Sequence, residues 1–251
     1  MDTSLIEQEF RRIKALGFLP NVKQDSNDGG AGNTFEKHLG VSENNLMEPD
    51  FQGFEVKTKK DYLKSKSPIS LFTKKPTFPN NGDGYMRQNW GVPDSVYKNV
   101  LCFRTSLYAN RWSVVYKEHK FKIEVNRDEE RIYIIKADLN EVVLDKSVYW
   151  SFSDVHSGAK KLHNLFLVDA QSKEIDNRTY FHYTGATVFL DYLGKENFID
   201  LVEAGTIRYD NRLGVYGAGT DKPGTPHNHG GGFRLDKKYV HKLYNTVIDV
   251  Q

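Results

Sequence analysis

The sequence predicts an α+β fold, in which helices and strands are mixed without the regular βαβ rhythm of a doubly wound sheet. Two observations support this class. From about Val100 onward, short runs rich in β-branched and aromatic residues dominate, whereas the N-terminal segment and two later segments have helical spacing. The chain of 251 residues is 38% hydrophobic and 27% charged, a balance typical of globular proteins.

The first predicted element is an amphipathic helix that begins with a capping box of Ser4 and Glu7 and ends at Gly17. Its expected apolar stripe consists of Leu5, Ile6, Phe10, Ile13 and Leu16. A polar, glycine-rich loop, "DSNDGGAGN", follows. The next run, "TFEKHLG", predicts a short helix that is capped by Asn33 or Thr34 and closed by Gly40.

The stretch "MEPDFQGFEVKTKK", residues 47–60, combines a turn at Pro49 and Asp50 with a strand that alternates apolar and charged residues. On a strand, Glu55 and Lys57 share one face, while the apolar residues between them take the other. Two carboxylates, from Asp50 and Glu55, form an oxygen site suited to Mg²⁺. A lysine beside them can orient a metal-bound water and neutralise charge on a phosphate. The alternative interpretation is an amphipathic edge strand with solvated charges.

The remainder predicts strands over "VLCFR", "RWSVVY", "KFKIEV", "RIYIIKA" and "RTYFHYTGATVFLDYL". Helices are expected over "SDVHSGAKKLHNLF" and "KENFIDLVEA", the second ended by Gly205. The last fifth is rich in glycine, aromatic and basic residues. It predicts a hairpin through "RYDNRLGVY" and a long loop that ends in "HNHGGG".

The charge distribution points to a phosphate-rich partner more strongly than the net charge of +2 does. Residues 57–75 hold seven lysines and one acid, a local +6, and residues 205–244 hold seven Lys and Arg and three Asp, a local +4. A single cysteine, Cys102, excludes an intrachain disulfide and a Cys-rich zinc module. Because the chain has neither a long apolar run nor a signal-peptide pattern, we expect a cytoplasmic protein.

The segment "PDFQGFEVK" resembles the PD-(D/E)XK nuclease motif. Together with "GNTFEKHLG" before it and "SPISLFTKKP" after it, it is similar to the MvaI/BcnI family of restriction endonucleases, relatives of the mismatch-repair nicking enzyme MutH. The resemblance covers most of the chain and is specific in residues 29–75. It implies that Asp50 and Glu55 are metal ligands, that Lys57 is the catalytic lysine, and that Glu36 is a supporting acid.

The same resemblance implies a nuclease core of mixed β-sheet flanked by helices, with two lobes that form a DNA-binding cleft. Residues 1–150 would be mainly the catalytic lobe and residues 151–251 mainly the recognition lobe. The implied activity is Mg²⁺-dependent hydrolysis of double-stranded DNA at a CCNGG-type pentanucleotide, with A or T at the centre. The implied enzyme is a bacterial monomer whose cell also holds a cognate DNA methyltransferase.

Reading G·C pairs requires hydrogen-bond donors for guanine and acceptors for cytosine. The last fifth of the chain offers candidates for both roles: Arg208, Arg212, His227, His229 and Arg234 as donors, Asp210 as an acceptor, and Tyr216 as a further contact. Lys59 and Lys60 are expected to contact phosphates together with the neighbouring lysines. The two histidines also form a His-x-His pair, for which zinc binding is an alternative.

Two other functions remain open from the sequence. One is a MutH-like nicking endonuclease with the same catalytic residues and a different site. The other is a non-cutting, sequence-specific DNA-binding protein whose acids are structural.

Overall fold

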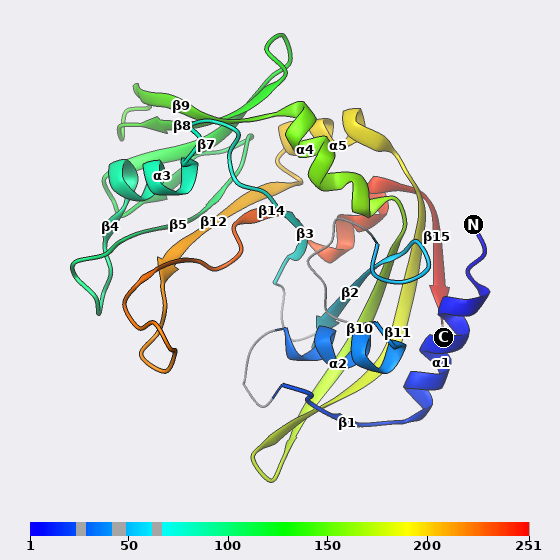
Figure 1. Ribbon diagram of the computed structural model, residues 1–251. Coiled ribbons are helices and arrows are strands. Elements are labelled where there is room, and N and C mark those ends of the chain that lie inside the picture. Colours follow the sequence, from blue (N-terminus) through cyan, green and yellow to red (C-terminus); the bar gives the residue numbers. More distant parts are fainter. Residues whose placement is uncertain (24–28, 42–48, 62–66, 251) are drawn as a thin grey trace. The chain divides into compact units, whose positions relative to one another are not determined.

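The computed structural model describes residues 1–23, 29–41, 49–61 and 67–250 (Figure 1). Its internal contacts divide the chain into two units. Unit 1 comprises Met1–Ile69, Lys160–Leu193 and Asp236–Gln251, and unit 2 comprises Ser70–Ala159 and Gly194–Leu235. The predicted α+β class is confirmed. The division differs from the predicted boundary near residue 150, because both units combine segments that are far apart in the sequence.

Unit 1 contains a mixed sheet in the order β1-β11-β10-β2, with β15 pairing β11 as well. Its strands are β1 (Leu19–Pro20), β2 (Glu55–Lys60), β10 (Leu165–Ile175), β11 (Arg178–Tyr192) and β15 (Tyr244–Val250). Strand β2 runs parallel to β10, and the other pairs are antiparallel. Two short 3₁₀ helices, η1 (Lys160–Leu162) and η2 (Lys237–Leu243), precede β10 and β15.

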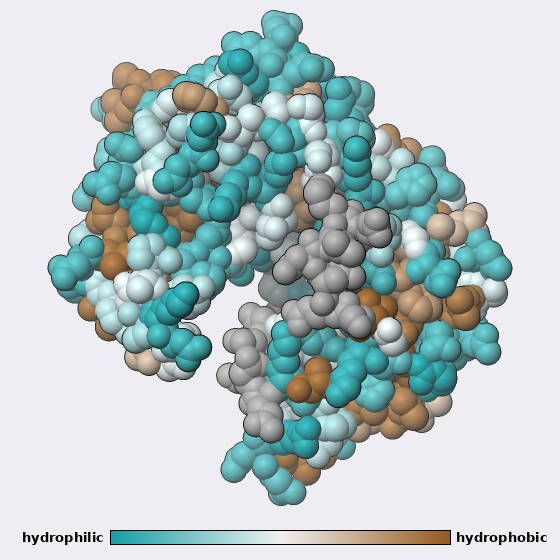
Figure 2. All heavy atoms as spheres, viewed as in Figure 1, coloured by the Kyte–Doolittle hydropathy of each residue, from teal (hydrophilic) through white to brown (hydrophobic). Residues whose placement is uncertain are grey.

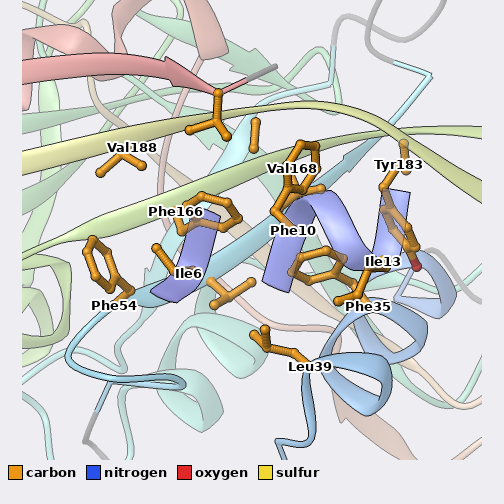
Figure 3. Close-up of a cluster of buried hydrophobic side chains, with 14 of the residues drawn as sticks. Ile6, Phe10, Ile13, Phe35, Leu39, Phe54, Phe166, Val168, Tyr183 and Val188 are labelled. Atoms are coloured by element: carbon orange, nitrogen blue, oxygen red, sulfur yellow. The ribbon is translucent and has the colours of Figure 1, made fainter. Parts of the chain in front are cut away.

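The core of unit 1 lies between this sheet and the helices α1 (Ser4–Ala15) and α2 (Gly30–Leu39) (Figure 3). Phe54 and Val56 beside β10 enter the same cluster as Phe10 and Phe35 of the helices. Because side chains alternate along a strand, the burial of Phe54 and Val56 turns Glu55 and Lys57 to the opposite face. The predicted alternation of this segment is confirmed.

The chain order explains why the units interleave. Parallel neighbours such as β2 and β10 require a long crossover connection. In this protein that crossover contains Ser70–Ala159, the first part of unit 2. The second part, Gly194–Leu235, lies between β11 and β15. Unit 2 is therefore formed by two insertions into the sheet of unit 1.

Unit 2 contains two further sheets. The first has the order β3-β14-β12-β5-β4, with β13 pairing β12, and the second has the order β6-β7-β8-β9. The strands are β3 (Ile69–Thr73), β4 (Val92–Pro93), β5 (Leu101–Leu107), β6 (Ser113–Val115), β7 (His119–Asn126), β8 (Arg131–Ala137), β9 (Val143–Ser151), β12 (Arg208–Val215), β13 (Pro226–Asn228) and β14 (Gly232–Leu235). The helices are α3 (Gly82–Trp90), α4 (Phe152–Ala159) and α5 (Gly194–Glu203).

Both N-terminal helices begin elsewhere than predicted. Helix α1 has Thr3 at its N-cap, and the Thr3 hydroxyl donates to Glu7 at 2.7 Å, so the Ser4–Glu7 capping box is wrong. Helix α2 begins at Gly30, inside the predicted loop, because Thr34 is buried and its Oγ1 accepts from the backbone of Val22. Leu5 and Leu16 of the predicted stripe of α1 are exposed, because the buried positions 6, 10 and 13 already face the core.

Two later predictions also differ from the structure. Residues 208–216 do not form a hairpin, because β12 runs straight to Val215 and pairs with β5 along one edge. The helix expected over residues 153–166 is shorter in the structure. The α-helix α4 ends at Ala159, the 3₁₀ helix η1 follows to Leu162, and β10 begins at Leu165. The apolar run "LFLV" fits a buried parallel strand as well as a helix end, so its period does not separate the two.

The surface in Figure 2 is largely hydrophilic, with smaller hydrophobic patches. None of the helices in the described ranges is long and apolar enough to cross a membrane.

Candidate active site and the arginine face

A two-residue turn brings the two predicted acids of unit 1 together. Phe51 and Phe54 exchange two backbone hydrogen bonds, at 3.0 and 2.8 Å, around Gln52 and Gly53. Both turn residues have positive φ, 47° and 83°, as the tight hairpin turns with the twist of a sheet require. The residues that flank this bridge are Asp50 and Glu55, which therefore stand opposite one another although five positions separate them in sequence.

Glu55 is buried and forms ion pairs with two lysines of this site. Its side chain is only 2% exposed, and its Oε1 lies 2.6 Å from Lys57 Nζ and 2.7 Å from Lys161 Nζ. The other carboxylate oxygen, Oε2, is buried and has no hydrogen-bond partner among the described residues. A buried anion is tolerated only when it is paired, and the two lysines supply that pairing on one oxygen alone.

Asp50 completes the acid pair. Its Oδ2 accepts a hydrogen bond from the backbone N–H of Val56 at 2.8 Å. Burial, and next the negative charge of Glu55, raise the pKa of Asp50 above its ordinary value. A divalent cation between the two carboxylates would remove this repulsion and supply the missing partner of Glu55 Oε2, so the residues present fit a hard metal ion such as Mg²⁺.

Glu36 lies on α2 and raises the pKa of the nearby Tyr183, after the larger effect of burial. Within the described ranges, no three His, Cys, Asp or Glu side chains gather as a metal cluster, so Glu36 is not grouped with Asp50 and Glu55. Its supporting role stays a prediction.

The lysines that follow on β2 point in different directions. Lys59 is 8% exposed, pairs in register with Asp169 of β10, and donates to the hydroxyl of Ser67. Lys60 is the next residue and therefore belongs to the opposite face of the strand. The two side chains cannot contact one phosphate together from this strand.

In unit 2, strand β12 carries Arg208, Asp210 and Arg212 at alternate positions, so the three share one face. Arg234 of β14 is the register partner of Arg208 and joins them. Four of the seven predicted DNA-binding residues of this unit thus come together on neighbouring strands.

Asp210 is buried, and its carboxylate interacts with side chains of the protein itself. Its Oδ1 accepts from the Ser106 hydroxyl at 2.7 Å and from Arg208 Nε at 3.2 Å, and its Oδ2 lies 3.6 Å from Arg234 Nε. Burial, followed by the repulsion of Arg212, lowers the pKa of the Arg234 guanidinium. In this arrangement Asp210 orients two arginines.

The other three predicted residues form an aromatic stack. The rings of Tyr216 and His227 lie 4.0 Å apart at 25°, and His229 meets His227 edge-on at 4.5 Å. His229 Nε2 lies 3.0 Å from the Val215 carbonyl, which can only accept, so that nitrogen carries the proton. Burial lowers the pKa of His227, and His229 and Arg87 lower it further. The part of the chain that the structure describes offers no third ligand for zinc beside this pair.

Sequence reasoning missed two residues that organise these sites. Lys161 reaches Glu55 from η1, and Arg87 of α3 donates to the carbonyls of Leu101, Gly214 and His227, which ties three strands together. Neither belongs to a local motif. Recognising β10 as the parallel neighbour of β2 would have placed Lys161, four residues before the first residue of β10 in "KLHNL", beside Glu55.

The fold and the site define a class of protein: a mixed-sheet nuclease with two acids and a lysine on a turn and strand. The family model of the MvaI/BcnI restriction endonuclease family matches residues 7–244, and the chain belongs to this family. It is a type II site-specific deoxyribonuclease.

Solved structures give a consistent comparison. The chain is similar to restriction endonuclease MvaI in complex with its cognate DNA substrate, with 27% identity, a TM-score of 0.89 and full coverage of both chains. It is also similar to MvaI in the absence of DNA, with 26% identity, a TM-score of 0.61, and 100% and 99% of the two chains covered. Comparison with curated protein sequences finds no match.

Proposed function

We propose that this enzyme is a monomeric, Mg²⁺-dependent restriction endonuclease that cuts double-stranded DNA at a CCNGG-type pentanucleotide with A or T at its centre. It would act in a bacterial cytoplasm beside a cognate DNA methyltransferase. The observation that carries the proposal is the acid pair Asp50 and Glu55. One buried carboxylate oxygen of Glu55 has no hydrogen-bond partner among the described residues, and the other contacts two lysines. The likeness to MvaI in complex with its cognate DNA supports double-stranded DNA as the substrate.

Asp50 and Glu55 would hold the metal ion, which would polarise the scissile phosphate and lower the pKa of a bound water. The backbone N–H of Val56 fixes the Asp50 carboxylate, so this ligand is oriented before metal or DNA arrives. Lys57 extends from the same strand and places a fixed positive charge beside the acids, where it stabilises the negative charge that develops on the phosphate. Its ammonium group can also orient the attacking water by hydrogen bonding.

The arginine face of unit 2 would read the bases. Arg208 and Arg234 are oriented by Asp210, which lowers the entropy lost when each guanidinium binds the N7 and O6 atoms of guanine. A His227 whose pKa is lowered stays neutral at pH 7 and can donate one hydrogen bond to a base. Tyr216 supports that ring by stacking.

Plasmid cleavage with sequencing of the fragment ends tests the proposal. Purified protein is incubated with plasmid DNA and Mg²⁺, beside Asp50→Asn and the control Asp61→Asn, an acid at the other end of β2 that accepts from Ser172. We expect double-strand ends at one pentanucleotide from the wild type and the control, and none from Asp50→Asn or in EDTA. Nicks alone at a GATC-type site would support the MutH-like alternative. Intact DNA despite tight binding would support a non-cutting DNA-binding protein.

A further inference from the structure

Two arginines of unit 2 face one another across a strand pair. Arg104 of β5 and Arg212 of β12 are Cα partners in the antiparallel register, and both side chains are exposed. Antiparallel partners share a face, so Arg104 belongs to the same face as Arg208 and Arg234. The motifs that predict DNA contact include Arg212 and not Arg104, which lies far away in the chain.

Like charges directly opposite each other destabilise a sheet, and this pair is poorly neutralised. Arg212 makes no side-chain hydrogen bond or ion pair with the described part of the chain. Arg104 Nη2 lies 3.8 Å from Asp94 Oδ2, at 53% exposure of the arginine side chain. The carboxylate of Asp94 already accepts from the backbone of Val96 and Tyr97. A repulsive pair kept on an exposed face indicates an anionic partner.

Gly214 of β12 makes room for Arg104. A Cβ built at Gly214 would lie 2.4 Å from Arg104 Nη2, so a side chain at this position would displace the guanidinium from its present place. The φ angle of this glycine is not in the left-handed region, so the backbone alone does not require glycine here. Glycine inside a strand marks a close approach, and here the approaching group is a guanidinium. Gly214 is also the register partner of His227, which places Arg104 against β12 at the predicted base contacts.

We propose that Arg104 is a specificity-determining residue that donates two hydrogen bonds to a guanine and extends the base-reading row from β12 onto β5. The inference rests on the proposed function, since it requires a DNA target. A base edge is favoured over a phosphate because the guanidinium lies between Asp94 and the backbone of β12 at Gly214, the register partner of His227. A planar fork held in this way suits the bidentate geometry of N7 and O6.

The first test measures binding, so that it does not depend on cleavage. The wild type selects its preferred sequence from a randomised duplex pool in Ca²⁺, and affinities are then measured for that duplex and for variants with one base pair changed. We expect Arg104→Gln to weaken binding to the preferred duplex about 10-fold and to lose discrimination at one G·C pair only. Arg131→Gln is the matched control, because Arg131 of β8 is 40% exposed, ion-paired to Glu129, and belongs to the other sheet of unit 2.

Two results would overturn the inference. An equal loss of affinity for every duplex, including random sequence, would make Arg104 a phosphate contact, and unchanged discrimination would leave it with no role in reading. A wild type that selects no sequence would instead refute the proposed function, and the inference with it.

A second variant tests the geometry itself. Gly214→Ala adds the Cβ that collides with the guanidinium while the arginine is retained. We expect it to lose discrimination at the same base pair as Arg104→Gln, and to add nothing in the Arg104→Gln background, since the group it displaces is then gone. Additive losses in the double variant would contradict a shared mechanism.

Discussion

The face of β2 that carries Glu55 and Lys57 (the β2 face) and the face of β12 that carries Arg208, Asp210 and Arg212 (the β12 face, or arginine face) are both rich in cations. Their positive charges are neutralised differently. On the β2 face, Lys57 and Lys161 share Glu55, and Lys237 Nζ lies 2.6 Å from Asp169 Oδ2. On the β12 face, Arg104, Arg208, Arg212 and Arg234 have only Asp94 and Asp210 as acidic partners among the described side chains.

The difference fits the two roles on DNA that we propose for these faces, reaction for the first and recognition for the second. A reaction at one phosphate needs a few charges fixed around one atom, and internal ion pairs fix them before substrate arrives. Recognition of a polyanion needs surplus positive charge, whose repulsion is relieved only on binding. Removing one acid should therefore lower the free energy of unfolding at the β12 face and raise it at the β2 face. Three predictions test the roles of the two faces, from the largest expected effect to the smallest.

The largest effect is expected for the lysines of Glu55. Lys57→Met should reduce the single-turnover cleavage rate by about 10³-fold, or about 4 kcal/mol, because it removes a preorganised charge from the reacting phosphate. Lys161→Met should reduce it by about 10-fold, since Lys161 extends from a single 3₁₀ turn rather than from the sheet. Because both ammonium groups contact the same Oε1 atom, the double variant should lose less than the sum.

Lys195→Met is the matched control for Lys161, because its ammonium group also contacts glutamates, Glu130 and Glu196, at 3.5 Å, and has similar exposure. Its cleavage rate should equal that of the wild type. A Lys161→Met enzyme as fast as this control would show that the contact with Glu55 is an ordinary surface ion pair.

Several strands and the local pattern of the candidate active site could be predicted from the sequence, because both depend on near neighbours. The alternation around Glu55 follows from a side-chain period of two, and the turn at Gly53 follows from the glycine. The partner of β2 could not be predicted, since β10 follows an insertion of about ninety residues that forms part of another unit. Because of the same insertion, the two compact units alternate along the chain, whereas the prediction places a single boundary near residue 150.

The arginine face shows the same limit on another scale. Arg208, Asp210 and Arg212 are visible as one cluster because they lie on one strand. Arg104 becomes their neighbour only through the register of β5 with β12, and a periodic pattern contains no register between distant strands. The buried role of Asp210 also depends on Ser106, which the same register brings within reach.

A smaller effect, on stability rather than on rate, is expected at Asp210. Asp210→Asn removes the acid that Arg208 and Arg234 share in a buried setting, and breaking such a pair leaves uncompensated charge. The free energy of unfolding should fall by about 3 kcal/mol. Urea unfolding measures it, with Asp200→Asn as the control, because Asp200 pairs with Arg127 at the surface and should contribute under about 1 kcal/mol. Equal losses in both variants would contradict the buried pairing.

The smallest expected effect is a gain in stability, and it concerns Asp50 of the acid pair in unit 1. Burial and the charge of Glu55 raise the pKa of Asp50, so the folded state holds its proton more readily than the unfolded state does. Its contribution to stability therefore falls as pH rises through the folded pKa. Asp50→Asn should abolish cleavage yet raise the metal-free free energy of unfolding at pH 7 by about 1 kcal/mol, and Asn can still accept from Val56.

Urea unfolding of this variant and of the wild type, in EDTA from acid to neutral pH, checks the sign. The gain should grow as the pH rises, because the wild-type carboxylate becomes charged, and Mg²⁺ should stabilise only the wild type. A variant that is less stable than the wild type at pH 7 would mean that Asp50 is held by favourable contacts, as Asp210 is. The contrast between the two faces would then be lost, because a carboxylate that serves as a metal ligand should destabilise the folded state when the metal ion is absent.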